Sequence, residues 1–149
     1  MQLEKRDGFT LLEIMVVVLI IGLLMTVLAT NVFKRLGGAQ ADIARLQVSK
    51  LSQQLELYKL DNGTYPTAEQ GLDALVREPT GEPRPRRYPE GGYVSSKDLL
   101  DPWQTQFKYE RPGKNNARSF DLYSYGADGQ PGGDGENAEI GNWEATTSN

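Results

Sequence analysis

Carboxylates are the side chains with which this sequence could do chemistry. The chain of 149 residues contains no histidine and no cysteine, which removes the commonest general base, thiolate metal ligands and disulfides. Any metal site must therefore be built from oxygen atoms, which are the ligands that a hard cation such as calcium prefers. The sequence also has no phosphate-binding glycine loop with a lysine and no Gly-x-Ser-x-Gly motif, so we predict that the protein is not an enzyme.

The densest group of carboxylates lies in a glycine-rich stretch near the C-terminus, residues 123–143. This stretch holds six glycines, four acids and no base. Left alone, such a segment should be disordered and self-repelling, whereas a divalent cation would bind its carboxylates and backbone carbonyls. The spacing is not that of an EF-hand. Chemistry alone therefore leaves two interpretations open, a calcium site and an ordinary solvated loop.

A further carboxylate, Glu13, stands out because of its surroundings. It immediately precedes an uncharged run of 20 residues, 14–33, which as a helix would span about 30 Å, the thickness of the hydrocarbon core of a bilayer. A carboxylate beside such a run is costly to bury unless it is paired. Three simpler interpretations are an ordinary single-span anchor, a glutamate that snorkels at the interface, and a secretory signal peptide cleaved near Val27-Leu28-Ala29.

The residues around Glu13 form a motif. Gly8-Phe9-Thr10-Leu11-Leu12-Glu13 follows a short charged leader, residues 1–8, and precedes the apolar run. This segment resembles the processing motif of type IV pilins and pseudopilins. The resemblance implies that a prepilin peptidase cuts between Gly8 and Phe9, that Phe9 is then N-methylated, and that Glu13 is needed for assembly. We predict that Glu13 neutralises the Phe9 amine of a neighbouring copy, because a buried ion pair is favourable only when both members are satisfied.

A long helix must position this motif. Residues 9–33 are the predicted transmembrane and assembly segment, and we expect the helix to continue to about residue 61 within a domain of residues 34–149. An apolar seam at helical spacing supports the continuation; it consists of Ala41, Ala44, Val48, Leu51, Leu55 and Tyr58. A second face is also partly apolar, with Ile43, Leu46, Leu57 and Leu60. This second face either contacts neighbouring copies or completes the core of a single monomer.

The fold is predicted to be α+β, with the long N-terminal helix packed on a small antiparallel sheet in a globular part, residues 62–149. Thr67 and Gln70 have the spacing of a capping box, which predicts a short second helix. Two alternating stretches, 106–110 and 119–124, predict an antiparallel pair of strands. The glycine- and aspartate-rich loop closes the chain.

Charge is unevenly distributed along the globular part. Residues 84–118 hold eight bases against four acids, whereas residues 119–149 hold six acids and no base. The bases include an exposed cluster in a proline- and glycine-rich loop, formed by Arg84, Arg86 and Arg87. These segments either attract one another between copies or are simply solvated. No dense basic patch accompanies the aromatic residues, so we predict no binding of nucleic acid.

The C-terminal loop makes the resemblance more specific. The segment 121–129, the glycine run after it, and Ile140-Gly141-Asn142-Trp143 are similar to the calcium loop of the major pseudopilins of type II secretion, as are segments 61–66, 70–75 and 101–103 elsewhere in the chain. The resemblance implies that Asp128 and Glu139 bind calcium through their side chains. Its further implied ligands are the backbone carbonyls of Tyr125 and Gln130, with Asp134 and Glu136 as additional candidates.

The resemblance also implies a function. Many copies would polymerise into the pseudopilus, a filament rooted by single-pass helices in the bacterial inner membrane with the C-terminal domains in the periplasm, and the filament would support export of folded proteins across the outer membrane. The implied partners are other copies of the chain, minor pseudopilins, the inner-membrane secretion platform, the prepilin peptidase and membrane lipid. Two alternatives are a type IV pilus subunit for adhesion or motility, and a membrane-tethered calcium-dependent binding module.

Overall fold

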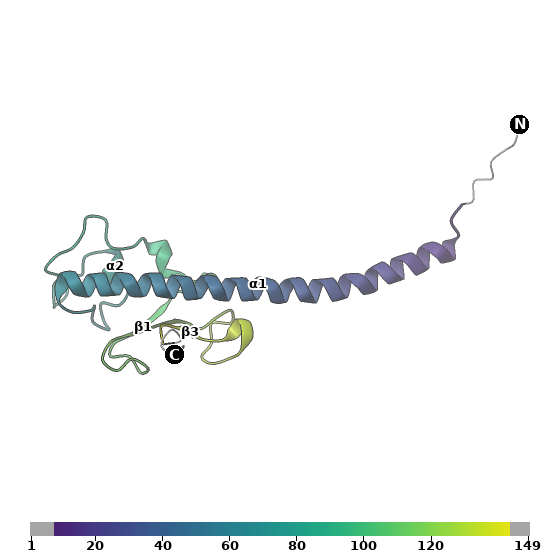
Figure 1. The fold of residues 1–149 in the computed structure, drawn as a ribbon. Coiled ribbons are helices and arrows are strands. Elements are labelled where there is room, and N and C mark those ends of the chain that lie inside the picture. The colour runs from purple at the N-terminus through teal and green to yellow at the C-terminus, as the bar shows by residue number, and fades with distance from the viewer. Residues whose placement is uncertain (1–7, 144–149) are drawn as a thin grey trace, which may run out of the picture. The chain divides into compact units, whose positions relative to one another are not determined.

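The computed structural model describes residues 8–143, except for the side chains of residues 27–37. Packing divides the chain into two units, Met1–Leu36 and Gly37–Asn149, and each is described by itself. In chain order the elements are α1 (Leu11–Asn62), α2 (Asp73–Val76), the 3-10 helix η1 (Ser96–Leu99), β1 (Lys108–Glu110), β2 (Asp121–Ser124), the 3-10 helix η2 (Gly135–Asn137) and β3 (Ile140–Gly141) (Figure 1).

The first unit consists of the N-terminal part of α1 and the residues before it. Its apolar side chains are exposed wherever the structure describes them; Phe9 is 78% exposed and Leu11 is 82% exposed. In the part of the chain that the structure describes, no helix is both long and apolar enough to cross a membrane. Residues 27–33, which end the predicted transmembrane segment, lie outside the described side chains, and residues 1–7 of the predicted leader lie outside the described residues altogether.

In the second unit, α1 buries the predicted seam. All six seam residues are at most 7% exposed, and they share one core with residues of the globular part, among them Leu75, Phe107 and Leu122. The second face is exposed: Leu46 is 71% exposed and Leu60 is 81% exposed. The interpretation in which both faces complete a monomer core is therefore wrong, because the globular part covers only the seam.

A three-stranded antiparallel sheet, in the order β1-β2-β3, lies beside the C-terminal half of α1 (Figure 1). Tyr109 pairs with Leu122 across β1 and β2, so the predicted strand pair is confirmed, although both strands are shorter than predicted. The third strand was not predicted. It has only two residues, and its pairing is continued by Asn142, whose backbone N–H donates to the Leu122 carbonyl at 3.0 Å.

The capping box that was predicted for the second helix is present. The Thr67 backbone N–H donates to the Gln70 side-chain oxygen at 3.1 Å, and the Gln70 backbone N–H donates to the Thr67 hydroxyl at 3.2 Å. The helix itself begins only at Asp73, because Gly71 has a φ of +56°, outside the helical region. It ends at Val76, where the Leu75 carbonyl accepts the backbone N–H of Tyr93 at 2.7 Å instead of continuing the helix.

Candidate functional site

The predicted cleavage site lies on exposed, non-helical backbone. Gly8, Phe9 and Thr10 precede α1, so a peptidase could reach the Gly8–Phe9 bond without unwinding the helix. Phe9 is 78% exposed, and no atom outside its immediate neighbours comes within 4 Å of a Cβ placed on Gly8. The local geometry is therefore compatible with the predicted processing.

Glu13 lies exposed in the first turn of α1. Its backbone N–H donates to the Thr10 hydroxyl at 3.2 Å, so Thr10 acts as the N-cap. The Glu13 side chain also sits where a negative charge is favoured by the helix dipole. The sequence interpretation missed the role of Thr10, although Thr10-Leu11-Leu12-Glu13 has the spacing of a capping box. Beside the carboxylate, Leu12 is 73% exposed, which places a charge within an uncovered apolar surface.

The glycine-rich, acidic segment between β2 and β3, residues 125–139, is referred to below as the acidic loop. The pairing of these two strands holds its ends together. Ser124, the last residue of β2, pairs with Ile140, the first residue of β3. Within the loop, the Ala127 backbone N–H donates to the Glu136 carbonyl at 2.9 Å. Gly126 has a φ of +79°, and a Cβ at that position would lie 2.7 Å from the same carbonyl oxygen. The loop is therefore a folded segment whose backbone carbonyls pack closely over Gly126.

Both predicted carboxylate ligands turn toward the backbone of this loop. Asp128 Oδ1 accepts the Gln130 N–H at 3.0 Å, and Glu139 Oε1 accepts the Gly132 N–H at 3.0 Å. The two additional candidates, Asp134 and Glu136, are exposed at η2 and make no side-chain hydrogen bond or ion pair with the described residues. Across residues 8–143, no three or more acidic side chains gather where they could hold a metal ion.

The two predicted backbone ligands belong to residues of different exposure. Tyr125 is half-buried, with Lys108 Nζ 5.9 Å from the centre of its ring, whereas Gln130 is exposed. The donor set of the loop thus consists of oxygens alone: two carboxylates that accept backbone N–H groups of the loop, and closely packed carbonyls. This chemistry fits a hard cation, which accepts carbonyl as well as carboxylate oxygens.

The buried side chain of Asp101 is hydrogen-bonded to Ser124, the residue that precedes the acidic loop. Asp101 is 1% exposed, and its carboxylate accepts the backbone N–H groups of Trp103 and Thr105 at 3.0 and 2.8 Å and the Ser124 hydroxyl at 2.6 Å. The Ser124 hydroxyl in turn accepts the Gly126 N–H at 3.1 Å. The sequence singled out segment 101–103 by its resemblance alone, and the link from Asp101 to the acidic loop was missed, because only the fold brings Ser124 within reach.

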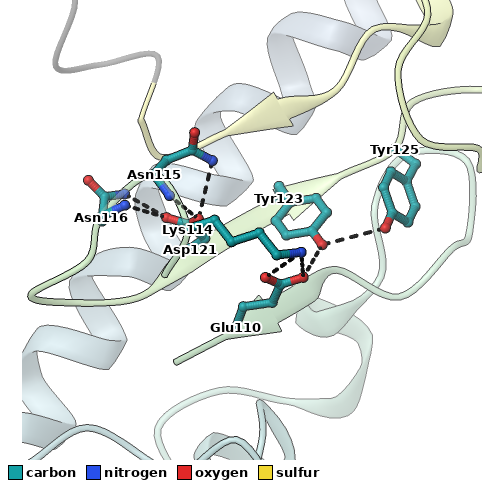
Figure 2. A network of polar contacts seen from close by, with 7 residues as sticks. All are labelled: Glu110, Lys114, Asn115, Asn116, Asp121, Tyr123 and Tyr125. Atoms are coloured by element: carbon teal, nitrogen blue, oxygen red, sulfur yellow. Dashed lines mark hydrogen bonds and ion pairs between the residues drawn. The ribbon is translucent and has the colours of Figure 1, made fainter. Parts of the chain in front are cut away.

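A polar network joins β1 to β2 next to the loop (Figure 2). The Tyr123 hydroxyl donates to Glu110 at 2.9 Å, and Lys114 Nζ lies 3.1 Å from the same carboxylate. The Tyr125 hydroxyl lies 3.5 Å from that of Tyr123. Burial raises the pKa of Tyr123, and its hydrogen bonds with Tyr125 and Glu110 act in the same direction. The network therefore keeps Tyr123 protonated and fixes the strand that leads into the acidic loop.

The turn between β1 and β2 is held by Asp121, the first residue of β2. Asp121 is 1% exposed, and its carboxylate accepts the backbone N–H groups of Asn115 and Asn116 at 2.7 and 3.0 Å (Figure 2). Trp143, which follows β3, is half-buried, with its ring against Gly141 and 5.5 Å from the Tyr123 ring.

Comparisons with known proteins match nearly the whole chain. Residues 31–143 match the family model of type II secretion system protein G, and residues 4–29 match the prokaryotic N-terminal methylation motif. The type II secretion system core protein G of Pseudomonas aeruginosa is 44% identical over 144 residues, which cover 97% of this chain and 99% of the relative. The corresponding protein of Vibrio cholerae is 44% identical over 142 residues, which cover 95% and 94%.

A solved structure agrees with these matches. The major pseudopilin from the type 2 secretion system of enterohaemorrhagic Escherichia coli superposes with a TM-score of 0.62 at 36% identity, covering 74% of this chain and 88% of that one. The methylation motif spans Gly8, Phe9 and Glu13, and the family model spans the fold and the acidic loop. The chain therefore belongs to the type II secretion system protein G family, the family of the major pseudopilins.

Proposed function

We propose that this chain is the structural subunit that polymerises into the pseudopilus of a type II secretion system. The observation that carries the proposal is the exposed apolar surface of α1 with Glu13 within it. Exposed apolar surface of this extent marks an interaction site in a soluble or membrane protein. Copies that pack head to tail without closing a ring would bury it in a filament. The family match favours this role over that of a type IV pilus subunit.

The finer parts of the proposal concern location and partners. The prepilin peptidase cuts between Gly8 and Phe9, and α1 anchors the chain in the inner membrane by a single pass, with the globular part in the periplasm. Minor pseudopilins and the inner-membrane platform receive or extend the filament. Export of folded proteins across the outer membrane follows from its growth, with a separate ATPase as the energy source.

Calcium is the proposed ligand of the acidic loop. Asp128 and Glu139 would hold it with their carboxylates, and Tyr125 and Gln130 would add backbone carbonyls. Bound calcium would supply the positive charge that a loop with four acids and no base lacks. The support is the oxygen-only donor set described above, together with the similarity of segment 121–143 to the loop of major pseudopilins. The alternative is a membrane-tethered calcium module that forms no filament, and the following experiment distinguishes it from the proposed subunit.

The test is filament formation by Glu13→Ala in cells that carry the rest of the secretion system. The unpaired amine of Phe9 then has no counter-charge on the neighbouring copy, so we expect filament yield to fall at least about tenfold, equivalent to about 1.4 kcal/mol. Electron microscopy and immunoblotting of sheared filaments measure the yield. Glu90→Ala, at an exposed acid of the globular part, is the matched control.

Mass spectrometry of the mature N-terminus completes this test. Processed protein should begin with N-methylated Phe9 in both variants, since Glu13 lies beyond the scissile bond. A mature chain that begins at Thr30 would support a secretory signal peptide instead. Filaments of normal yield from Glu13→Ala would rule out the proposed ion pair, and a complete absence of wild-type filaments would rule out the filament itself.

A further inference from the structure

The arginines of the loop 79–92 lie on the surface with their charges available. We refer to Arg84, Arg86 and Arg87 as the basic cluster. The Arg84 side chain is 72% exposed, with its Nε 3.6 Å from a Glu82 carboxylate oxygen. The side chains of Arg86 and Arg87 are exposed and make no ion pair with the residues that the structure describes. Three guanidinium groups thus lie within four residues, and the contact of Arg84 with Glu82 is their one ion pair among the described residues.

The backbone beneath the basic cluster is fixed. Gln70 Nε2 donates to the carbonyls of Gly81 and Pro83 at 3.3 and 3.1 Å. The Arg87 backbone N–H donates to Asn62 Oδ1 at 3.0 Å, which ties the loop to the last residue of α1. A partner that binds here would meet a surface whose backbone is already ordered, so little backbone entropy is lost on binding.

A groove of 230 Å³ opens beside the basic cluster. Arg84 and Arg86 line it together with Asn62, the last residue of α1, and Gly63, which follows it. Guanidinium groups bind carboxylates in a fixed, often bidentate geometry. The groove is therefore suited to acidic side chains of a protein partner.

The acidic loop carries carboxylates that match this surface. Asp134 and Glu136 are exposed and without side-chain partners among the described residues, and no Lys or Arg occurs from residue 119 onward. Within the second unit, the loop 79–92 lies at the C-terminal end of α1, and the acidic loop with η2 lies farther toward the N-terminal end (Figure 1). One copy thus carries opposite charges at the two ends of its globular part.

We propose that the basic cluster of one copy binds Asp134 and Glu136 of the next copy. The inference rests on the proposed filament and deepens it by naming the surfaces in contact. Two different patches that complement each other form a head-to-tail contact, which generates an open assembly when the contact does not close into a ring. Complementary charges fix the register of such a contact and disfavour alternatives. Asp128 and Glu139 take no part, because their carboxylates already accept backbone N–H groups of the acidic loop.

The first experiment reverses the charges in vivo, with sheared filament yield as the measurement. Arg86→Glu with Arg87→Glu should lower the yield at least about tenfold, because attraction becomes repulsion. Asp134→Lys with Glu136→Lys should do the same, and the four changes together should restore the yield to within about twofold of wild type. Lys97→Glu with Arg118→Glu, an equal change of net charge at exposed bases outside the cluster, should leave the yield unchanged.

The second experiment uses the absence of native cysteine. Arg86→Cys combined with Glu136→Cys, oxidised in sheared filaments, should give a ladder of dimers and higher species on a non-reducing gel. Lys97→Cys combined with Glu136→Cys is the control and should give monomer.

The outcomes separate the two proposals. The contact would be overturned if filaments of the Arg86→Cys, Glu136→Cys variant form normally but give no ladder. It would also be overturned if the variant with all four charge reversals assembles no better than either double reversal. The proposed filament would stand in both cases. No filaments from the wild type would overturn the proposed function, and the contact with it.

Discussion

Single side chains in this molecule decide which backbone segments stay together. Asp101 and Asp121 are each 1% exposed, and their bonded partners are backbone N–H groups, a serine hydroxyl and side-chain amides rather than cations. A buried carboxylate is stable only when its oxygens are satisfied by donors. Each aspartate therefore fixes a turn, and Asp101 additionally fixes the start of the acidic loop through Ser124.

Ser124→Ala tests this link. The substitution leaves one Asp101 oxygen and the Gly126 N–H without their partner, so we expect the free energy of unfolding to fall by about 1–3 kcal/mol. Chemical denaturation of the purified protein in detergent, followed by Trp fluorescence, measures the change. Ser96→Ala, at an exposed serine, should change it by less than about 0.5 kcal/mol. Equal effects of the two variants would contradict the role of Ser124.

Tyr93 gives the molecule a dependence on alkaline pH. Burial raises its pKa from 10.0 to about 12, and its hydrogen bond to Asp61, at 3.0 Å, acts in the same direction. Above pH 10 the unfolded chain loses a proton that the folded chain retains, so the stability present below pH 10 should fall as pH rises to about 12.

Urea unfolding midpoints between pH 8 and 12 measure this dependence. Tyr93→Phe should make the fall between pH 10 and 12 shallower, because the substituted ring has no proton to lose. The burial of Tyr88 also raises its pKa to about 12, so part of the fall should persist. An identical slope in the variant would show that the tyrosine hydroxyl is not the group responsible.

At the scale of elements, α1 is the feature that the sequence predicts best. Apolar residues at 3.6-residue spacing lie on one face of a helix, so the burial of the six seam residues could be predicted from their spacing alone. Strand β3 was not predictable in the same way. Its two residues are too few for a pattern, and its position depends on Asn142, whose amide side chain accepts the Leu122 N–H and donates to the Phe120 carbonyl.

The two faces of α1 should respond differently to substitution. Leu55 is fully buried in the seam, so Leu55→Ala should lower the free energy of unfolding by about 2–5 kcal/mol through the cavity that it leaves. Leu60 is 81% exposed, so Leu60→Ala should change it by less than about 0.5 kcal/mol. Denaturation of the two variants under identical conditions makes the comparison. A large loss of monomer stability from Leu60→Ala would show that the second face is covered.

At the scale of the whole molecule, some parts of the candidate sites could be predicted from the sequence and others could not. The processing motif was recognisable because its residues are contiguous, and the acidic loop because its composition is extreme. The supports of the loop, Asp101 and Ser124, were not recognisable, since 23 residues separate them along the chain. Residues that depend on tertiary contact have no local signal, and the fold alone brings them together.

Calcium should stabilise the molecule as a whole. A ligand present at a hundredfold excess over its Kd stabilises the folded state by about 2.7 kcal/mol, so Tm should rise on adding calcium and return to its starting value with a chelator. Differential scanning calorimetry of wild type and Asp128→Ala measures the effect, which should be absent from the variant. Glu90→Ala should respond as wild type does. If the Tm of the wild type in calcium does not change when chelator is added, the proposed calcium site is wrong.

The turn that Asp121 organises has a practical use. Asp121 holds Asn115 and Asn116 in the middle of this turn, and Glu110 pairs with Asp121 where the two strands meet it. Ala117 and Arg118 are exposed. Lengthening a loop whose ends are already fixed costs only about 0.6 kcal/mol for each doubling. A short epitope inserted between Ala117 and Arg118 should therefore be displayed without loss of the fold, which provides a position for antibody labelling of the protein in cells.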